Sequence, residues 1–164
     1  MNKSPLTKKQ IIGLFNKQKK LISSSEIIDL QYSEGRILAK DIKSQINIPP
    51  FNNSAVDGYA LLKKDLNLIR KTFICKRRIA AGDNKKIVVR SGEAVRVFTG
   101  AKMPSNSSTV VMQENVRVKG NYITLLKTPQ FGENYRLKGE DIKKNKMILP
   151  IGTKINNQNL NLIA

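Results

Sequence analysis

Three short polar segments contain the residues that could do chemistry in this chain. The first is "PPFNNSAVDGYA" (49–60), in which prolines and asparagines prevent a helix and favour a turn around Ser54 and Asp57. A carboxylate held in a turn can accept backbone N–H bonds, orient a substrate or help to bind Mg²⁺. Asp57 can equally do no more than stabilise its own turn, a common role of aspartate, and the residues alone leave both interpretations open.

The second segment, "RVFTGAKMPSNSS" (96–108), places Thr99 and Gly100 where a β run passes into a loop. Backbone N–H groups and the Thr99 hydroxyl can converge on an anion at such a strand end. An ordinary junction between a strand and a loop would contain the same residues.

The third segment, "NYRLKGEDI" (134–142), contains Arg136, Glu140 and Asp141 around a glycine. The guanidinium can bind an anionic group through two hydrogen bonds, and the carboxylates can meet a metal or a lysine. The alternative is a surface ion-pair loop that contributes little free energy.

No complete catalytic set accompanies these segments. The chain has no histidine for proton transfer near neutral pH, and its one cysteine, Cys75, has no partner for a disulfide or a thiolate metal site. It contains neither a Walker loop nor a dinucleotide-binding glycine loop. Residue types and spacing by themselves predict only a basic, β-rich domain.

Composition restricts the class of protein further. Of 164 residues, 40% are apolar, which is enough for a hydrophobic core. The 30 Lys and Arg residues against 12 Asp and Glu give a net charge of +18, which attracts polyanions. Aromatic residues are only 5%, and no zinc, zipper or RNA-binding motif is present, so a dedicated nucleic-acid binder is not expected. Without a signal peptide or an apolar run of about 20 residues, the chain is predicted to be cytoplasmic, with no membrane contact.

The three segments must be positioned by a mostly β fold. Apolar residues at helical spacing predict a helix over 6–22, and Asn156 can cap a last helix. Lys119-Gly120-Asn121 separates two alternating runs as in a hairpin. The runs that predict strands are "TFIC", "KIVV", "AVRVF", "STVVMQ", "VRV" and "YITLL".

The predicted fold class is therefore α+β, mostly β. We expect a β-rich, barrel-like domain (47–140) inserted into a small mixed α/β segment formed by residues 1–46 plus 141–164, because many short strands at such spacing are typical of small barrels.

Taken in order, the three segments resemble the molybdopterin molybdenumtransferase family, which comprises the bacterial MoeA proteins and the E domain of gephyrin. The first is similar to the family pattern P-x-F-x-x-S-x-x-D-G-Y-A. The second, continued as "TVVMQE", is similar to T-G-A-x-x-P-x-G-A-D-x-V-V-x-x-E, and the third to N-I-R-x-x-G-E-D-I. "GRILAKDI" and the final "LPIGTKINNQNLNLIA" also match in order, so the resemblance covers nearly all of the chain from Gly35 onward.

The resemblance implies a transferase of molybdenum cofactor biosynthesis that inserts molybdate into adenylylated molybdopterin and releases AMP, with Mg²⁺ assisting. It implies a homodimer, and a molybdopterin adenylyltransferase as a partner in the pathway. Carried over to matching positions, the implied catalytic residues are Asp57, Thr99 and Asp141. The implied substrate- or anion-binding residues are Ser54, Gly100, Arg136 and Glu140, and the implied metal ligand is Asp57.

Two departures from the family pattern matter. Asn106 stands at the family glycine and Ser108 at the family aspartate. Asparagine tolerates a left-handed backbone, so we expect the turn to survive, whereas any role of that carboxylate is lost. Family members are also more than twice as long, and their molybdopterin-binding domain would begin after Ala164. The chain alone is therefore expected to supply half of a composite site at a dimer interface and to be inactive.

Two other functional classes remain open at this point. A basic module can bind a polyanion or a partner protein without chemistry, an interpretation that the charge of +18 favours. A scaffold or dimerisation domain is the other, by similarity to gephyrin.

Overall fold

The computed structural model describes residues 5–17, 24–66 and 71–164. The chain divides into two compact units, one made of Met1–Ile42 and Ile148–Ala164 and the other of Lys43–Met147. The second unit is thus inserted in the first, and the predicted fold class, α+β and mostly β with an inserted barrel-like domain, is confirmed. The domain limits predicted from the sequence, after residues 46 and 140, fall inside the second unit and stay predictions.

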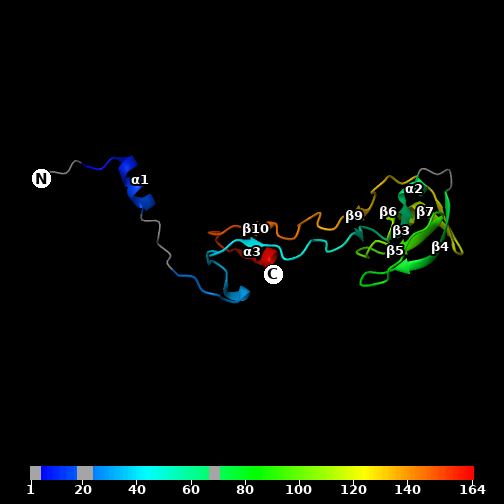
Figure 1. The fold of residues 1–164 in the computed structure, drawn as a ribbon, viewed down its shortest axis with the longest axis horizontal. Helices are drawn as coiled ribbons and strands as arrows, with labels where there is room; N and C mark the ends of the chain where they lie inside the picture. The colour runs from blue at the N-terminus through cyan, green and yellow to red at the C-terminus, as the bar shows by residue number, and fades with distance from the viewer. Residues whose placement is uncertain (1–4, 18–23, 67–70) are drawn as a thin grey trace. The chain divides into compact units, whose positions relative to one another are not determined.

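A six-stranded sheet forms the centre of the second unit and curls as a half-barrel (Figure 1). Its strand order is β6-β3-β5-β4-β8-β7, and every neighbouring pair is antiparallel except β4 and β5. The strands are β3 (Gly58–Leu62), β4 (Thr72–Ile79), β5 (Glu93–Val97), β6 (Ser107–Met112), β7 (Val116–Lys119) and β8 (Tyr122–Leu125).

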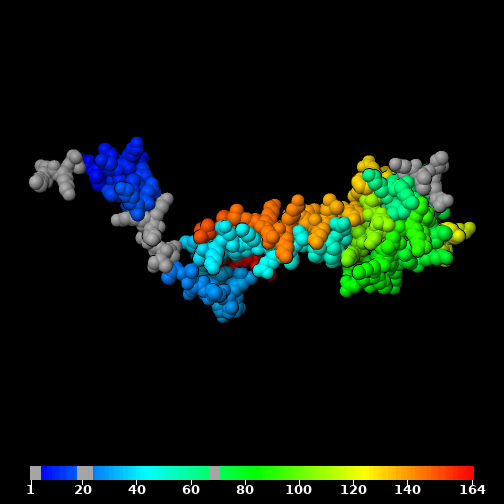
Figure 2. Space-filling view, in the orientation of Figure 1, coloured from blue at the N-terminus to red at the C-terminus, as the bar shows by residue number. Residues whose placement is uncertain are grey.

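Strand β3 is buried along its whole length, because both faces of the sheet are covered there. Tyr59 and Leu61 join one hydrophobic cluster, whereas Ala60 and Leu62 join the other, as the alternation of side chains along a strand requires. In the space-filling view, the residues of these strands form one dense body (Figure 2). The strand that follows Asp57 is therefore anchored in the core along its whole length.

Gly58 begins β3 at a place where only glycine fits. A Cβ atom at this position would lie 2.2 Å from the backbone oxygen of Val111 on the neighbouring strand β6. The close approach of the two backbones explains why a glycine follows Asp57.

Most of the predicted elements are present. The hairpin is confirmed, with Val118 opposite Ile123, and five of the six predicted runs form strands. "KIVV" does not, because within the described part of the chain it forms just an isolated bridge, between Val88 and Ser105. The predicted cap is confirmed, since Asn156 Oδ1 accepts a hydrogen bond of 2.9 Å from the Asn159 N–H.

The remaining elements are short. Helix α1 (Lys8–Lys17) confirms the middle of the first predicted helix, while residues 18–22 of that prediction lie outside the described residues. Within the described parts of the chain, no helix is long and apolar enough to cross a membrane. The others are η1 (Leu30–Tyr32), β1 (Ile42–Lys43), β2 (Asn53–Ser54), α2 (Lys63–Leu66), η2 (Gln113–Asn115), β9 (Tyr135–Arg136), β10 (Met147–Leu149) and α3 (Asn157–Ile163).

Candidate functional site

Asp57 and Thr99 meet at one end of the sheet. Asp57 directly precedes β3, and Thr99 lies two residues after β5; because Gly58 is paired with Val97, the two segments arrive at the same place. Asp57 Oδ1 accepts a hydrogen bond of 2.8 Å from the Thr99 backbone N–H and another of 2.8 Å from the Thr99 hydroxyl. The side chain of Asp57 thus joins the first and second segments, and among the described residues it forms no hydrogen bond within its own turn.

These bonds determine the charge of the carboxylate. The Thr99 N–H, then the Thr99 hydroxyl, hold the pKa of Asp57 below its ordinary value of 3.8, and the positive charge of Arg96 lowers it further. Asp57 is therefore ionised at neutral pH. Among the described residues its second oxygen, Oδ2, accepts no hydrogen bond and is available to a ligand.

Ser54 and Gly100 hold the two segments together through their backbones. The Gly100 N–H donates to the Ser54 carbonyl at 2.8 Å, and the Ser54 N–H donates to the Ala101 carbonyl at 3.0 Å. Ser54 is buried, and its hydroxyl donates to the Val56 carbonyl at 2.6 Å. In this structure both residues use these donors within the protein, so their predicted contact with an anion stays a prediction.

Arg136, Glu140 and Asp141 form a second group. Arg136 Nε lies 2.8 Å from Glu140 Oε1, and a terminal nitrogen of Arg136 lies 2.7 Å from Asp141 Oδ2. The hydrogen bond from Arg136, then that from the Leu137 N–H, lower the pKa of Glu140. The guanidinium is thus engaged by two carboxylates of its own loop, and its predicted role as an anion clamp also stays a prediction.

The two groups are connected by backbone and not by side chains. Strand β2 pairs with β9 so that Asn53 is opposite Arg136 and Ser54 is opposite Tyr135. No hydrogen bond or ion pair among the described residues joins Asp57 or Thr99 to the Arg136 group. The structure therefore brings Asp57, Thr99, Ser54 and Gly100 together, and places Arg136, Glu140 and Asp141 on an adjoining segment.

Arg96 is a residue of this region that the sequence did not single out. Its guanidinium carbon lies 4.9 Å from the ring centre of Tyr59 and 5.0 Å from that of Phe98. A terminal nitrogen of Arg96 donates a hydrogen bond to Gln113 Oε1. These contacts fix a positive charge close to Asp57. Its position three residues before Thr99, on a strand of alternating apolar residues, was the only signal in the sequence.

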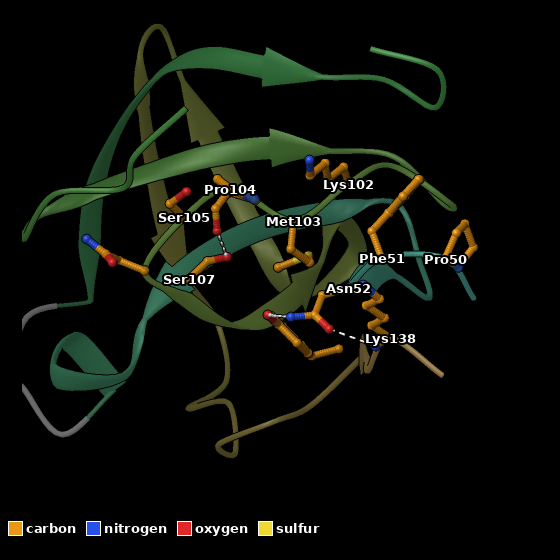
Figure 3. A pocket seen from close by; sticks show the side chains of 11 residues that line it. Pro50, Phe51, Asn52, Lys102, Met103, Pro104, Ser105, Ser107 and Lys138 are labelled. Carbon is orange, nitrogen blue, oxygen red and sulfur yellow. Dashed lines mark hydrogen bonds between the residues drawn. The ribbon is translucent and has the colours of Figure 1, made fainter. Parts of the chain in front are cut away.

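The sequence also did not reveal a pocket of about 540 Å³ between the same segments (Figure 3). Its walls come from residues 50–52 of the first segment, residues 102–107 of the second, and Tyr135 and Lys138 of the third. All three polar segments thus contribute to one cavity as well as to the Asp57 and Arg136 groups.

The two departures from the family pattern have different structural outcomes. Asn106 has a φ of 68°, so the prediction that asparagine would preserve a left-handed turn is confirmed. The hydroxyl oxygen of Ser108 is buried, and no hydrogen-bond partner for it is found among the described residues. The prediction that any role of the family carboxylate is lost here stays a prediction.

Comparison with known proteins gives a consistent result. Residues 7–164 match the family model described as MoeA N-terminal region (domain I and II). A molybdopterin molybdenumtransferase of Nostoc is 38% identical over 157 residues, which are 92% of this chain and 36% of the relative. That of Haemophilus influenzae is 36% identical over 143 residues, covering 87% of this chain and 35% of the relative.

A solved structure agrees with these relatives. The molybdopterin biosynthesis moeA protein of Pyrococcus horikoshii OT3 superposes with a TM-score of 0.78 at 34% identity, over 86% of this chain and 38% of that chain. The chain thus spans little more than a third of the length of the proteins that it matches.

Proposed function

Because the chain belongs to the MoeA N-terminal family, we propose that it is the N-terminal part of a molybdopterin molybdenumtransferase. In this proposal the whole enzyme transfers molybdate into adenylylated molybdopterin and releases AMP, as a step in the biosynthesis of the molybdenum cofactor. The observation that carries it is the contact of Asp57 with Thr99, which joins two of the three family segments at one end of the sheet.

The two residues have complementary roles in this proposal. Thr99 fixes Asp57 through two donors to one oxygen, so that Oδ2 keeps a single orientation. A carboxylate that is ionised and held in this way can accept a proton or orient a water molecule. Arg96 supplies a fixed positive charge beside it, which favours the approach of anionic substrates such as molybdate and a pyrophosphate.

Mg²⁺ can bind in this region only if water and substrate phosphates supply most of its ligands. The described residues contain no group of three side chains of the His, Cys, Asp or Glu type that could hold a metal ion. Mg²⁺ often takes one or two carboxylates and completes its shell with water and substrate phosphates, so Asp57 Oδ2 suits it as a single protein ligand. When bound, the ion would supply positive charge to neutralise phosphate oxygens.

We also propose that the chain supplies one half of a composite site. It corresponds to little more than a third of its relatives, and its polar groups contain no complete catalytic set. The other half would come from a molybdopterin-binding domain of the partner subunit in a homodimer. The chain alone is then expected to release no AMP.

A complementation assay tests the proposal. The 164-residue chain is mixed with the C-terminal two-thirds of the Nostoc relative, and AMP release from adenylylated molybdopterin is followed after molybdate is added. We expect release in the mixture, none from either part alone, and a loss of about tenfold or more with Asp57→Asn, as for a residue that orients a reacting group.

Asp83→Asn is the matched control. Asp83 is also a loop carboxylate whose pKa is lowered, first by a backbone N–H, that of Ala80, and then by Lys85, but it belongs to none of the three segments. This variant should release AMP at the wild-type rate. An active mixture that is indifferent to Asp57→Asn would remove Asp57 from the site.

A non-catalytic module that binds a polyanion or a partner protein is the second candidate, and the charge of +18 favours it. Any basic chain loses affinity for DNA as salt rises, so that loss does not distinguish the two candidates. A preference of the isolated chain for one nucleic-acid sequence or structure, at fixed salt, would favour the module over the enzyme.

A further inference from the structure

One residue, Asn52, connects the walls of the pocket, which are formed by residues 50–52 and 102–107 with Tyr135 and Lys138. Asn52 Nδ2 donates to the Tyr135 hydroxyl at 2.9 Å, and Asn52 Oδ1 accepts from the Lys138 N–H at 2.7 Å (Figure 3). Its backbone carbonyl accepts from the Met103 N–H at 2.9 Å. Asn52 therefore connects all three walls of this open pocket through hydrogen bonds.

The charged side chains that line the pocket are all positive. Lys102 and Lys138 line it, and neither of these ammonium groups forms an ion pair among the described residues. The lining contains no carboxylate. Ser105 and Asn106 add a hydroxyl and an amide that have no hydrogen-bond partner among the described residues. The pocket thus offers two positive charges and two polar groups to a ligand that carries negative charge.

The pocket also has an apolar side. The half-buried ring of Phe51 lies beside Pro50, and the Nζ atom of Lys102 lies 6.0 Å from the centre of that ring. The buried side chain of Met103 adds further apolar surface. A volume of about 540 Å³ is larger than an inorganic oxyanion needs and falls in the range of small-molecule sites.

We propose that this pocket binds a small organic anion in which a phosphate or carboxylate group is attached to a flat ring. The anionic group lies between Lys102 and Lys138, and the ring lies against Phe51. Binding here uses neither Asp57 nor Thr99 and does not depend on the activity proposed above.

A titration of the whole chain tests this, with amide chemical shifts as the readout at constant ionic strength. Three probes separate the contributions: inorganic phosphate, phenyl phosphate and benzoate. We expect phenyl phosphate to shift the amides of residues 102–107 and 138 and to bind about tenfold more tightly than inorganic phosphate, because only the former can stack on Phe51. Benzoate distinguishes a carboxylate from a phosphate preference by its affinity relative to phenyl phosphate.

Two pairs of lysine substitutions distinguish binding in the pocket from general attraction of an anion to a basic protein. Lys102→Ala with Lys138→Ala should weaken phenyl phosphate about tenfold or more, whereas Lys119→Ala with Lys127→Ala, an equal change of charge outside the pocket, should weaken it less than about twofold. Phe51→Ala should abolish the preference for phenyl phosphate over inorganic phosphate. Lys102→Gln with Lys138→Gln repeats the first test if the alanine variant does not fold.

Equal weakening by the two lysine pairs would overturn the proposal, because it would mean attraction by the overall charge alone. Shifts spread over basic residues throughout the chain, or no shift in residues 102–107, would overturn it as well.

Discussion

Asp57 accepts two hydrogen bonds of 2.8 Å on a single oxygen, and both come from Thr99, which lies 42 positions further along the chain. The contact exists because β3 and β5 are antiparallel neighbours and the two residues flank the same end of that pair. One bond comes from the backbone and one from the side chain, so a substitution at Thr99 can remove the side-chain bond and keep the backbone bond.

Thr99→Val removes the hydroxyl and keeps the N–H. The hydroxyl is the second-largest cause of the lowered pKa of Asp57, after the N–H and before the charge of Arg96. Without it, this pKa should rise toward its ordinary value of 3.8 without reaching it. NMR titration of the Asp57 side-chain carboxyl carbon measures the change. Thr99→Ser, which keeps the hydroxyl, should leave the pKa at its wild-type value, and an unshifted pKa in Thr99→Val would contradict this assignment.

Asp57→Asn should make stability less dependent on pH. A carboxylate whose folded pKa is lowered stabilises the fold above its unfolded value, and this contribution is lost as the pH falls through the folded pKa. The variant should therefore be less stable than the wild type at neutral pH, and the difference should shrink from about pH 4 downward. Urea unfolding of both proteins across this range measures it; a constant difference at every pH would show that Asp57 has no perturbed titration.

Gly58→Ala should destabilise the second unit strongly. The new Cβ would lie 2.2 Å from the Val111 oxygen, a backbone atom held by the pairing of β3 with β6, and relieving this clash should cost about 2–4 kcal/mol of the free energy of unfolding. Gly13→Ala is the control, because nothing lies within 4 Å of that site on α1. It should change stability by no more than about 1 kcal/mol, in the stabilising direction. Similar urea midpoints for Gly58→Ala and the wild type would mean that the two strands can separate easily.

Arg136→Gln should raise the pKa of Glu140 toward its ordinary value of 4.5. The hydrogen bond from Arg136 is the main cause of the lowered pKa, and the remaining bond from the Leu137 N–H should prevent a full return. The matched variant Arg77→Gln breaks the ion pair with Glu93 and should leave the pKa of Glu140 unchanged. If both variants shift Glu140 equally, the cause is the overall charge of the protein and not the local contact.

Local sequence determined several features without help from the rest of the chain. The hairpin at Gly120, the cap at Asn156 and the left-handed turn at Asn106 are short-range, since each depends on the backbone preferences of a few adjacent residues. The order of the three polar segments was sufficient to identify the family. Periodicity was less reliable at "KIVV", an apolar run that pairs with no strand along its length among the residues that the structure describes and forms an isolated bridge to Ser105.

Contacts between distant residues were decided only by the tertiary structure. The partner of Asp57 depends on which strands are neighbours, and the parallel pairing of β4 with β5 has no local signal. The same holds for the pocket, whose three walls meet at Asn52. The sequence by itself therefore determined the family and the local turns, because these follow from residue order and from local conformation, and it predicted which residues could carry chemistry. The fold alone decided which of them meet, because strand pairing brings together atoms that no spacing along the chain relates.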